Sequence, residues 1–444
     1  MSKTFRIGGV HPPENKISKA KAIVEFPIPE TVVIPLSQHI GAPAVACVAK
    51  GDVVKVGQII ATAGGFVSSN IHSSVSGKVT SIDAILDGGG LRKPAITIKV
   101  EGDEWAEGID LSTDLVTECS LTPAEIVKKI AEAGIVGMGG ATFPTQVKLS
   151  VPEGKTAEYL ILNGVECEPY LTSDHRVMLE HGQEMIVGVQ ILAKALGVKK
   201  SYVGIEENKP DAIKHLQTIT ASMNDIEIVP LHVQYPQGGE KQLIDAVISR
   251  QVPSGKLPID VQAVVQNVST ALAVYHAVQK NLPLISRTVT VTGKSMTETG
   301  NFKVRIGTPI SALLAYCGGL PEDTGKVING GPMMGRSMCN LESSVTKGTS
   351  GILVMNDKEA KRNEAASCIK CAKCVSVCPM ALEPFLISKM AQKSMFEALE
   401  DERVADCIEC GSCSYICPAS LPLLDYIRIG KGEVMKIMRA RAAK

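Results

Sequence analysis

Two runs of closely spaced cysteines near the C-terminus constrain this 444-residue chain more than any other feature. Cys368, Cys371, Cys374 and Cys378 follow the spacing C-x2-C-x2-C-x3-C, and Pro379 comes directly after them. The same spacing, again followed by a proline, recurs at Cys407, Cys410, Cys413 and Cys417. Eight of the 13 cysteines therefore lie in these two runs.

This spacing is typical of a pair of [4Fe–4S] clusters. Three closely spaced thiolates hold one face of a cubane, and the fourth cysteine of each run reaches the other cluster. We therefore assign the first three cysteines of the first run, with Cys417, to cluster 1, and the first three of the second run, with Cys378, to cluster 2. Structural zinc is the alternative, but zinc sites normally use two separated cysteine pairs. The spacing thus predicts a module that transfers single electrons.

The charge balance and the aromatic content argue against nucleic acid as a ligand. Lys plus Arg and Asp plus Glu both number 46, and aromatic residues make up 4% of the chain. A neutral chain creates no long-range field that attracts polyanions, and few rings are available for base stacking. We find no secretory signal and no apolar run of the ~18 residues that a transmembrane helix needs. We expect an intracellular protein that can only dock at a membrane.

Residues 30–100 predict a small all-β unit. Short runs of Val, Ile, Gly and Pro alternate there with turn signals at 50–52 and 87–90. The segment 51–58, followed by 76–79, resembles the barrel-sandwich of lipoyl and biotinyl carrier domains. No lysine lies between Gly57 and Gly77, so we expect a structural unit without carrier chemistry.

From Thr122 onward the periodicity predicts alternating helices and strands. Thr122-Pro123-Ala124-Glu125 has the N-cap and first-turn residues of a helix that ends near Ala133. Strands are expected near 159–163, 201–206, 226–231 and 263–266, with helices at about 177–196, 211–221, 241–249 and 270–279. This alternation predicts a mostly parallel sheet with helices on both faces.

The remaining segments complete a multidomain α/β chain. After Pro283 we expect a strand at 288–293, a short helix at 308–316 and a charged helix at 356–366 that leads to the cysteines. The predicted units are an N-terminal strap with a barrel-sandwich unit (1–115), a Rossmann-like α/β domain (116–283), a β-grasp-like unit (284–355) and a ferredoxin-like cluster module with a basic tail (356–444).

Polar and glycine-rich segments follow the predicted strands of the α/β domain. Ligands of open α/β sheets bind at this edge. Residues 163–169 follow the first strand, residues 235–240 follow the third, and Asn267 ends the fourth. A glycine-rich loop at 134–144 precedes the first strand and lacks the dinucleotide fingerprint. Its bared N–H groups could hold a phosphate, and a tight packing turn is the alternative.

These motifs occur in the same order in the flavin-binding 51 kDa subunit of respiratory complex I, which the chain resembles. The likeness continues through Gly307-Thr308-Pro309 and residues 329–332 of the β-grasp-like (SLBB-type) unit. The segment 8–16 near the start of the chain makes the resemblance more specific. Over essentially its whole length the chain resembles the C subunits of Rnf complexes, which are membrane-bound, ion-translocating ferredoxin:NAD+ oxidoreductases.

The resemblance implies a bound FMN, with NAD(H) as substrate. It places FMN at Gly137, Gly139, Gly140, Asn163, Glu166, Tyr235, Gly238, Gly239, Glu240, Asn267 and Thr270. It places NAD(H) against Phe143, Lys148 and Glu168, where Glu168 could hold ribose hydroxyls and Lys148 a phosphate or a flavin edge; a solvated side chain is the alternative for both. FMN converts between hydride and single-electron transfer. The implied partners are the other subunits of the complex, at the cytoplasmic face of the cell membrane.

Four positions depart from the complex I pattern. That family has Arg, Gly, Asp and Glu at the positions of Met138, Thr142, Val165 and Gly239, respectively. The expected pocket therefore has one cation and two carboxylates fewer. His11 belongs to a segment that we expect to cross another domain as a strap.

Two other functions remain open. One is a corrinoid reductase with the same order of modules. The other is a flavin-free docking subunit, similar to the A subunit of sodium-translocating NADH:quinone reductase, although such a scaffold needs no redox cysteines.

Overall fold

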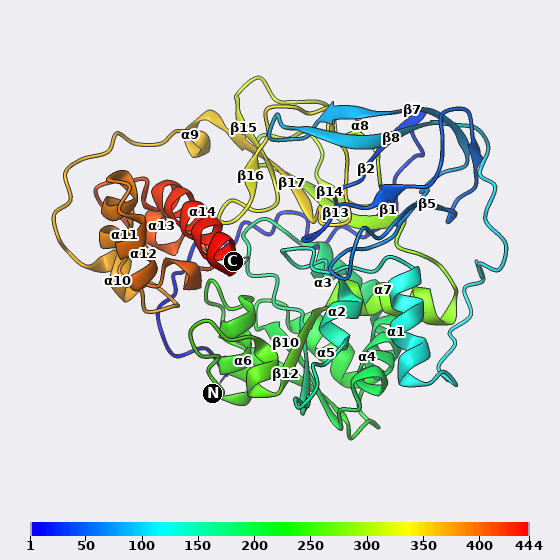
Figure 1. Ribbon diagram of the computed structural model, residues 1–444, viewed down its shortest axis with the longest axis horizontal. Coiled ribbons are helices and arrows are strands. Elements are labelled where there is room, and N and C mark those ends of the chain that lie inside the picture. Colours follow the sequence, from blue (N-terminus) through cyan, green and yellow to red (C-terminus); the bar gives the residue numbers. More distant parts are fainter. Residues whose placement is uncertain (1, 443–444) are drawn as a thin grey trace.

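The computed structural model describes residues 2–442 and arranges them in β, α/β and helical units (Figure 1). Within these residues, no helix combines the length and the apolar character that crossing a bilayer requires.

The N-terminal β unit consists of two small antiparallel sheets. Burial alternates along residues 31–35, so one face of the first sheet is buried, with Val32, Ile34 and Ile96 fully enclosed. The first sheet has the order β2 (Thr31–Pro35), β8 (Arg92–Val100), β7 (Gly77–Leu86) and β4 (Val53–Val54), and the second has β3 (Val45–Ala46), β5 (Ile59–Thr62) and β6 (Ile71–His72). The predicted barrel-sandwich unit is confirmed.

The α/β domain is built on a four-stranded sheet that is parallel throughout. Leu160 and Leu162 pack on one face against the helices α1, α4 and α7, and Ile161 packs on the other against α6. The predicted parallel sheet with helices on both faces is therefore confirmed. The strand order is β11 (Ile226–Leu231), β10 (Lys200–Glu206), β9 (Tyr159–Asn163) and β12 (Ala263–Asn267). The helices are α1 (Pro123–Glu132), α2 (Thr145–Leu149), α3 (Ser173–Glu180), α4 (Gly182–Leu196), α5 (Pro210–Ile219), α6 (Glu240–Ile248) and α7 (Val268–Gln279).

One predicted helix of this domain is divided in two. The expected helix 177–196 consists of α3 (Ser173–Glu180) and α4 (Gly182–Leu196), separated at His181. Helix α3 begins earlier because the Glu166 carboxylate accepts hydrogen bonds from the N–H groups of Asp174 (2.8 Å) and His175 (3.2 Å).

Close packing between α4 and α7 fixes the helix that carries Asn267 at its start. A methyl group at Gly188 of α4 would overlap the carbonyl oxygen of Ala271 in α7. We therefore expect Gly188→Ala to lower the free energy of unfolding by about 1–3 kcal/mol, as overpacking does. Chemical denaturation monitored by circular dichroism measures the change.

The matched control is Gly432→Ala in α14 (Leu423–Ala442), where an added methyl group meets no atom within 4 Å. This control is expected to stabilise its helix by roughly 0.5–1 kcal/mol. Equal behaviour of the two variants would contradict close packing at Gly188.

The third unit is a mixed six-stranded sheet, and one of its edge strands comes from the N-terminal segment of the chain. Strand β1 (Ile23–Glu25) pairs in parallel with β14 (Gly300–Arg305) at one edge. The order continues through β13 (Ser286–Thr292), β17 (Gly351–Asn356), β15 (Thr324–Asn329) and β16 (Arg336–Ser337), and α8 (Ile310–Tyr316) packs on the sheet. The strand expected at 288–293 and the short helix at 308–316 are confirmed.

The cluster module lies at one end of the molecule (Figure 1). The helix expected at 356–366 is wrong beyond its first turn, because only α9 (Asp357–Ala360) is helical. Residues 361–367 are all exposed, so no apolar face supports further helix. The module continues with α10 (Lys373–Ser376), α11 (Pro384–Gln392), α12 (Phe396–Asp401), α13 (Ser412–Tyr415) and α14.

The N-terminal strap runs between the α/β domain and the cluster module, as expected (Figure 1). Val10 exchanges backbone hydrogen bonds with Tyr235 (2.8 and 2.9 Å), and Gly9 donates to the carbonyl of Val377 (2.9 Å). At Gly8 (φ 77°) a side chain would lie 2.6 Å from the backbone of Cys378. The strap therefore ties the start of the chain to both units.

Candidate redox site

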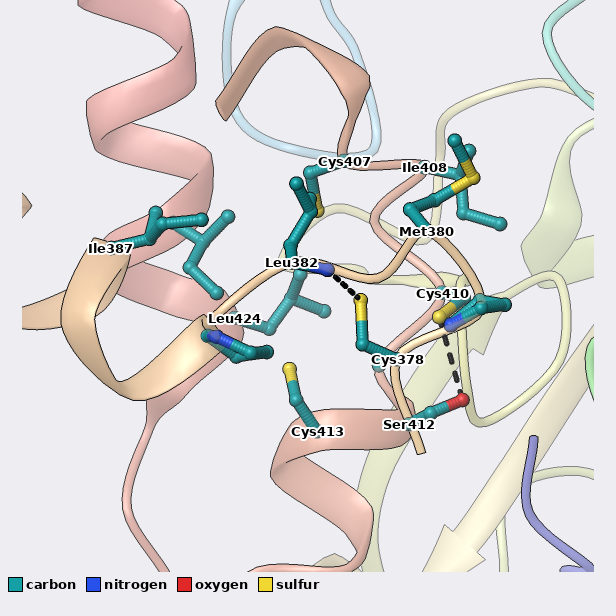
Figure 2. A pocket seen from close by; sticks show the side chains of 14 residues that line it. Cys378, Met380, Leu382, Ile387, Cys407, Ile408, Cys410, Ser412, Cys413 and Leu424 are labelled. Atoms are coloured by element: carbon teal, nitrogen blue, oxygen red, sulfur yellow. Dashed lines mark hydrogen bonds between the residues drawn. The ribbon is translucent and has the colours of Figure 1, made fainter. Parts of the chain in front are cut away.

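Four thiols line one pocket in the cluster module (Figure 2). They are those of Cys378, Cys407, Cys410 and Cys413, so the last cysteine of the first run lies with the first three of the second run. This is the set that the sequence assigns to cluster 2. The rest of the lining is largely apolar and includes Leu382, Ile387, Ile408, Leu424 and Ile427.

The chemistry of this pocket fits a cubane. Burial raises the pKa of Cys407 to about 11 and that of Cys413 to about 12. Bare thiols would therefore stay protonated at neutral pH, and iron would replace those protons. Backbone N–H groups of Leu382 and Glu409 lie 3.4 Å from the sulfurs of Cys378 and Cys407, respectively. Such donors stabilise the negative charge of cluster sulfur.

The thiols surround a volume instead of meeting at one point. Within residues 2–442, no group of three or more His, Cys, Asp or Glu side chains is arranged to hold a single metal ion.

The four cysteines assigned to cluster 1 are more open to solvent. Cys371 is exposed, and Cys368, Cys374 and Cys417 are half-buried. The segment before Cys368 lies beside the chain after Cys417, because Ala366 N–H donates to the carbonyl of Ala419 (2.9 Å). Burial raises the pKa of Cys374, and the Cys417 thiol adds slightly to that shift.

The glycine-rich loop presents an open backbone at the edge of the α/β domain. Gly139 and Gly140 are exposed, and within residues 2–442 their N–H groups have no hydrogen-bond acceptor. A side chain at Gly139 would lie 2.8 Å from the Asn267 amide, whereas Gly140 faces open space. Gly137 closes the loop by donating to the carbonyl of Phe143 (2.8 Å), whose side chain is half-buried. Bared N–H groups of this kind can bind a phosphate.

The side chains of Asn267 and Thr270 lie against this loop. The Asn267 side chain caps α7 by accepting from Ser269 N–H (2.8 Å) and donates to Asp174 (2.7 Å). The Thr270 hydroxyl accepts from the N–H of Met138 (3.0 Å). Both predicted residues therefore lie beside the loop: Thr270 holds it through a hydrogen bond, and the Asn267 amide lies against Gly139.

Two charged residues that sequence analysis missed complete this support. Arg287 of β13 is only 3% exposed and donates to the carbonyls of Met138 and Thr349, both at 3.2 Å. Burial lowers the pKa of Arg287 to about 10, and the nearby Asp174 carboxylate opposes that shift. Burial raises the pKa of Asp174 to about 6, helped by Glu166. No sequence motif links these residues, because they come from different units of the fold.

The other predicted flavin contacts gather at the ends of β9 and β11. The Asn163 amide donates to the carbonyl of Gly238 (2.8 Å). Gly239 precedes α6, and Glu240 at the first turn of that helix pairs with Lys148 (2.6 Å), which also donates to the carbonyl of Val265 (3.1 Å).

Two predicted residues contact other units instead of the glycine loop. The Tyr235 hydroxyl donates to the carbonyl of Cys410 (2.8 Å), and the residue is 2% exposed, so this hydroxyl is not available to a flavin. The Glu168 carboxylate accepts from the N–H groups of Met333 (3.0 Å) and Met334 (2.6 Å) in the third unit. Burial raises the pKa of Glu168 to about 7, although these donors act in the opposite direction.

Two further lysines that the sequence analysis did not identify as site residues fix the loop after β9 through hydrogen bonds. Lys16 of the strap donates to the carbonyls of Glu166 (2.7 Å), Glu168 (2.9 Å) and Leu171 (2.7 Å). Lys209 is 2% exposed and donates to the carbonyl of Val165 (2.7 Å). The strap thus orders the segment that contains Glu166 and Glu168.

Family models match all four units of the chain. They are the RnfC barrel sandwich hybrid domain (residues 3–103), the Nuo51 FMN-binding domain (130–276), the SLBB domain (288–337) and the 4Fe-4S dicluster domain (360–418). Among solved structures, an NAD+-reducing [NiFe]-hydrogenase in its air-oxidized state matches 70% of this chain and 66% of that chain, with a TM-score of 0.49 and 15% identity.

Curated relatives match nearly end to end. The C subunit of the proton-translocating ferredoxin:NAD(+) oxidoreductase complex of Clostridium ljungdahlii is 47% identical over 90% of this chain and 87% of its own length. The C subunit of the Na(+)-translocating complex of Acetobacterium woodii is 43% identical over 97% of both. The chain therefore belongs to the family of C subunits of ion-translocating ferredoxin:NAD(+) oxidoreductase complexes.

Proposed function

We propose that this chain carries electrons between NAD(H) and the other subunits of an ion-translocating ferredoxin:NAD+ oxidoreductase complex, through one FMN and two [4Fe–4S] clusters. The observation that carries the proposal is the direct contact between a domain of the FMN-binding family and the thiol pocket of cluster 2. That contact is the bond from the Tyr235 hydroxyl to the carbonyl of Cys410. The chain is peripheral, at the cytoplasmic face of the cell membrane.

The glycine loop is the proposed phosphate site of FMN. The N–H groups of Gly139 and Gly140 would hold the phosphate, and Asn267 and Thr270 keep the loop in place. When bound, FMN exchanges a hydride with NAD(H) and single electrons with the clusters. The phosphate is an anion, so the buried cation of Arg287 under the loop favours its binding.

NAD(H) is proposed to bind beside the loop, against Phe143 and Lys148. The Lys148 ammonium, paired with Glu240, is half-exposed and can turn toward an added phosphate. Glu168 could bind a ribose only if it gave up its hydrogen bonds to the N–H groups of Met333 and Met334. With those bonds in place, Glu168 holds the third unit against the α/β domain.

The decisive experiment is an anaerobic titration of the reconstituted chain with NADH, followed by visible absorption and EPR spectroscopy. We expect about eight irons per chain from two cubanes, one FMN, and reduction of flavin and cluster signals in the same titration. A chain that holds iron but no flavin would contradict the proposal and favour the docking role. Rapid NADH oxidation that requires a corrinoid acceptor would favour the corrinoid reductase.

A further inference from the structure

The two cluster sites differ in what covers them. The pocket of cluster 2 is more enclosed, because Cys378, Cys410 and Cys413 are each 8% exposed and Cys407 is half-buried. The ligands of cluster 1 are half-buried or, at Cys371, exposed. Because the two sets share one small module, this asymmetry indicates that the clusters face different neighbours.

Cluster 2 faces the α/β domain. Tyr235 contacts the carbonyl of Cys410, and the Gln242 amide of α6 donates to the carbonyl of Pro379 (3.1 Å), next to Cys378. The strap closes the same side through Gly9 and Val377. The side of the module that meets the proposed flavin domain is therefore occupied by this chain itself.

Cluster 1 faces outward. Ile369, between two of its ligands, is 68% exposed, and residues 361–373 are all exposed except Cys368. Figure 1 shows this connection between α9 and α10 on the outer side of the module. Lys370 and Lys373, which flank Cys371, are also exposed, and neither ammonium has an ion-pair partner within residues 2–442. Arg362, by contrast, pairs with Asp425.

We propose that this outer face, formed by Ile369, Lys370, Cys371 and Lys373, is the docking surface for an acidic redox protein. The partner has carboxylates around its own metal or flavin centre. One electron passes between cluster 1 and that centre, with no bond made or broken. The inference rests on the proposed function, because it assigns cluster 2 to the flavin side and cluster 1 to the exchange with the partner.

The residue types suit a transient electron-transfer contact. An exposed isoleucine beside a cluster ligand can exclude water from a small interface, and the two unpaired ammonium groups attract carboxylates. Electrostatic attraction raises the association rate without demanding a large buried area. The basic C-terminal helix is a weaker candidate, because Lys436 pairs with Glu433 and Arg441 with Glu400.

The test compares two double variants of the full, cofactor-loaded chain. Lys370→Glu/Lys373→Glu reverses the charges of the proposed surface. Lys50→Glu/Lys78→Glu makes the same change of net charge at two exposed lysines of the N-terminal β unit. Lys78 lies in β7, and Lys50 lies just before β4, the strand that pairs with β7. Each is added to membrane vesicles that contain the other subunits of the complex, prepared from cells that lack this chain.

At low ionic strength we expect the first variant to bind these vesicles roughly tenfold or more weakly than the unaltered chain, and the second to bind as the unaltered chain does. The difference should shrink above about 0.1 M salt, where the Debye length is ~10 Å. Iron content, flavin content and NADH-driven cluster reduction should be unchanged in both.

Equal binding of the two variants would overturn the docking surface. Charge-sensitive binding to protein-free anionic lipid vesicles would overturn the choice of a protein partner and indicate a membrane contact. Failure of NADH to reduce the clusters in the unaltered chain would contradict the proposed function, and it is distinguishable because vesicle binding is measured separately.

Discussion

Replacing Cys378 with alanine is expected to remove the cluster of the second cysteine run, and with it about four of the eight irons. Cys378 belongs to the first run in sequence, but its thiol lines the pocket with Cys407, Cys410 and Cys413 (Figure 2). Alanine leaves one iron without a protein ligand in a site where burial already disfavours free thiolates. Iron and acid-labile sulfide analysis, with EPR of the dithionite-reduced chain, measures the loss.

The reciprocal variant is Cys371→Ala, which changes an exposed ligand of the other set. It should remove the signal of cluster 1 and leave that of cluster 2. The two variants should therefore lose different EPR signals. If Cys378→Ala and Cys371→Ala lost the same signal, the exchange of ligands between the runs would be wrong.

The loss of cluster 2 should also isolate cluster 1 from NADH. Tyr235 and Gln242 connect the α/β domain to the segments around Cys410 and Pro379, whereas cluster 1 faces outward. In Cys378→Ala, NADH should still reduce the flavin, but cluster 1 should be reduced far more slowly than by dithionite.

The parts of this fold that sequence predicts are those set by local patterns. Strands β9 to β12 were predictable because each is a short, mostly apolar segment rich in Val, Ile or Leu between helical patterns, as a doubly covered parallel sheet requires. The grouping of Cys378 with Cys407, Cys410 and Cys413 around one pocket was predictable because paired cubanes use a short, regular cysteine spacing. The β unit was predictable because its turn residues separate short β-branched runs.

The rest depends on contacts between distant segments. Charge alone suggested a helix at 356–366, but this segment has no surface to pack against, and it is extended after Ala360. The early start of α3 at Ser173 follows from the Glu166 cap, which periodicity does not reveal. Tyr235 fits the order of a flavin motif, yet its hydroxyl contacts a cluster ligand from another unit.

The missing cation of the glycine loop is a further case. The complex I pattern has arginine where Met138 stands, and sequence comparison therefore suggested a pocket that had lost a positive charge. The structure places the guanidinium of Arg287 against the carbonyl of that same Met138. A positive charge thus lies under the loop, supplied by a strand of the next unit, and no local motif could have revealed it.

We therefore expect Arg287→Met to lower the affinity for FMN by at least tenfold, which corresponds to about 1.4 kcal/mol. Methionine keeps much of the apolar volume but leaves the carbonyls of Met138 and Thr349 without their donor, and Asp174 without its cation. Leaving buried polar groups without partners should also lower the free energy of unfolding, by about 1–3 kcal/mol per group. Flavin affinity is measured by fluorescence titration of the flavin-depleted chain with FMN, on protein that retains both clusters.

Arg305→Met is the matched control for this loss. Arg305 lies on the adjacent strand β14, is also shielded from solvent, and donates to the carbonyl of Ser74 (2.8 Å) while its guanidinium stacks over Trp105. It contacts the N-terminal β unit and not the glycine loop, so its replacement should reduce stability and leave FMN affinity unchanged. If both variants bound FMN as tightly as the unaltered chain, Arg287 would be only a structural residue, and the glycine loop would lose its assignment as the phosphate site.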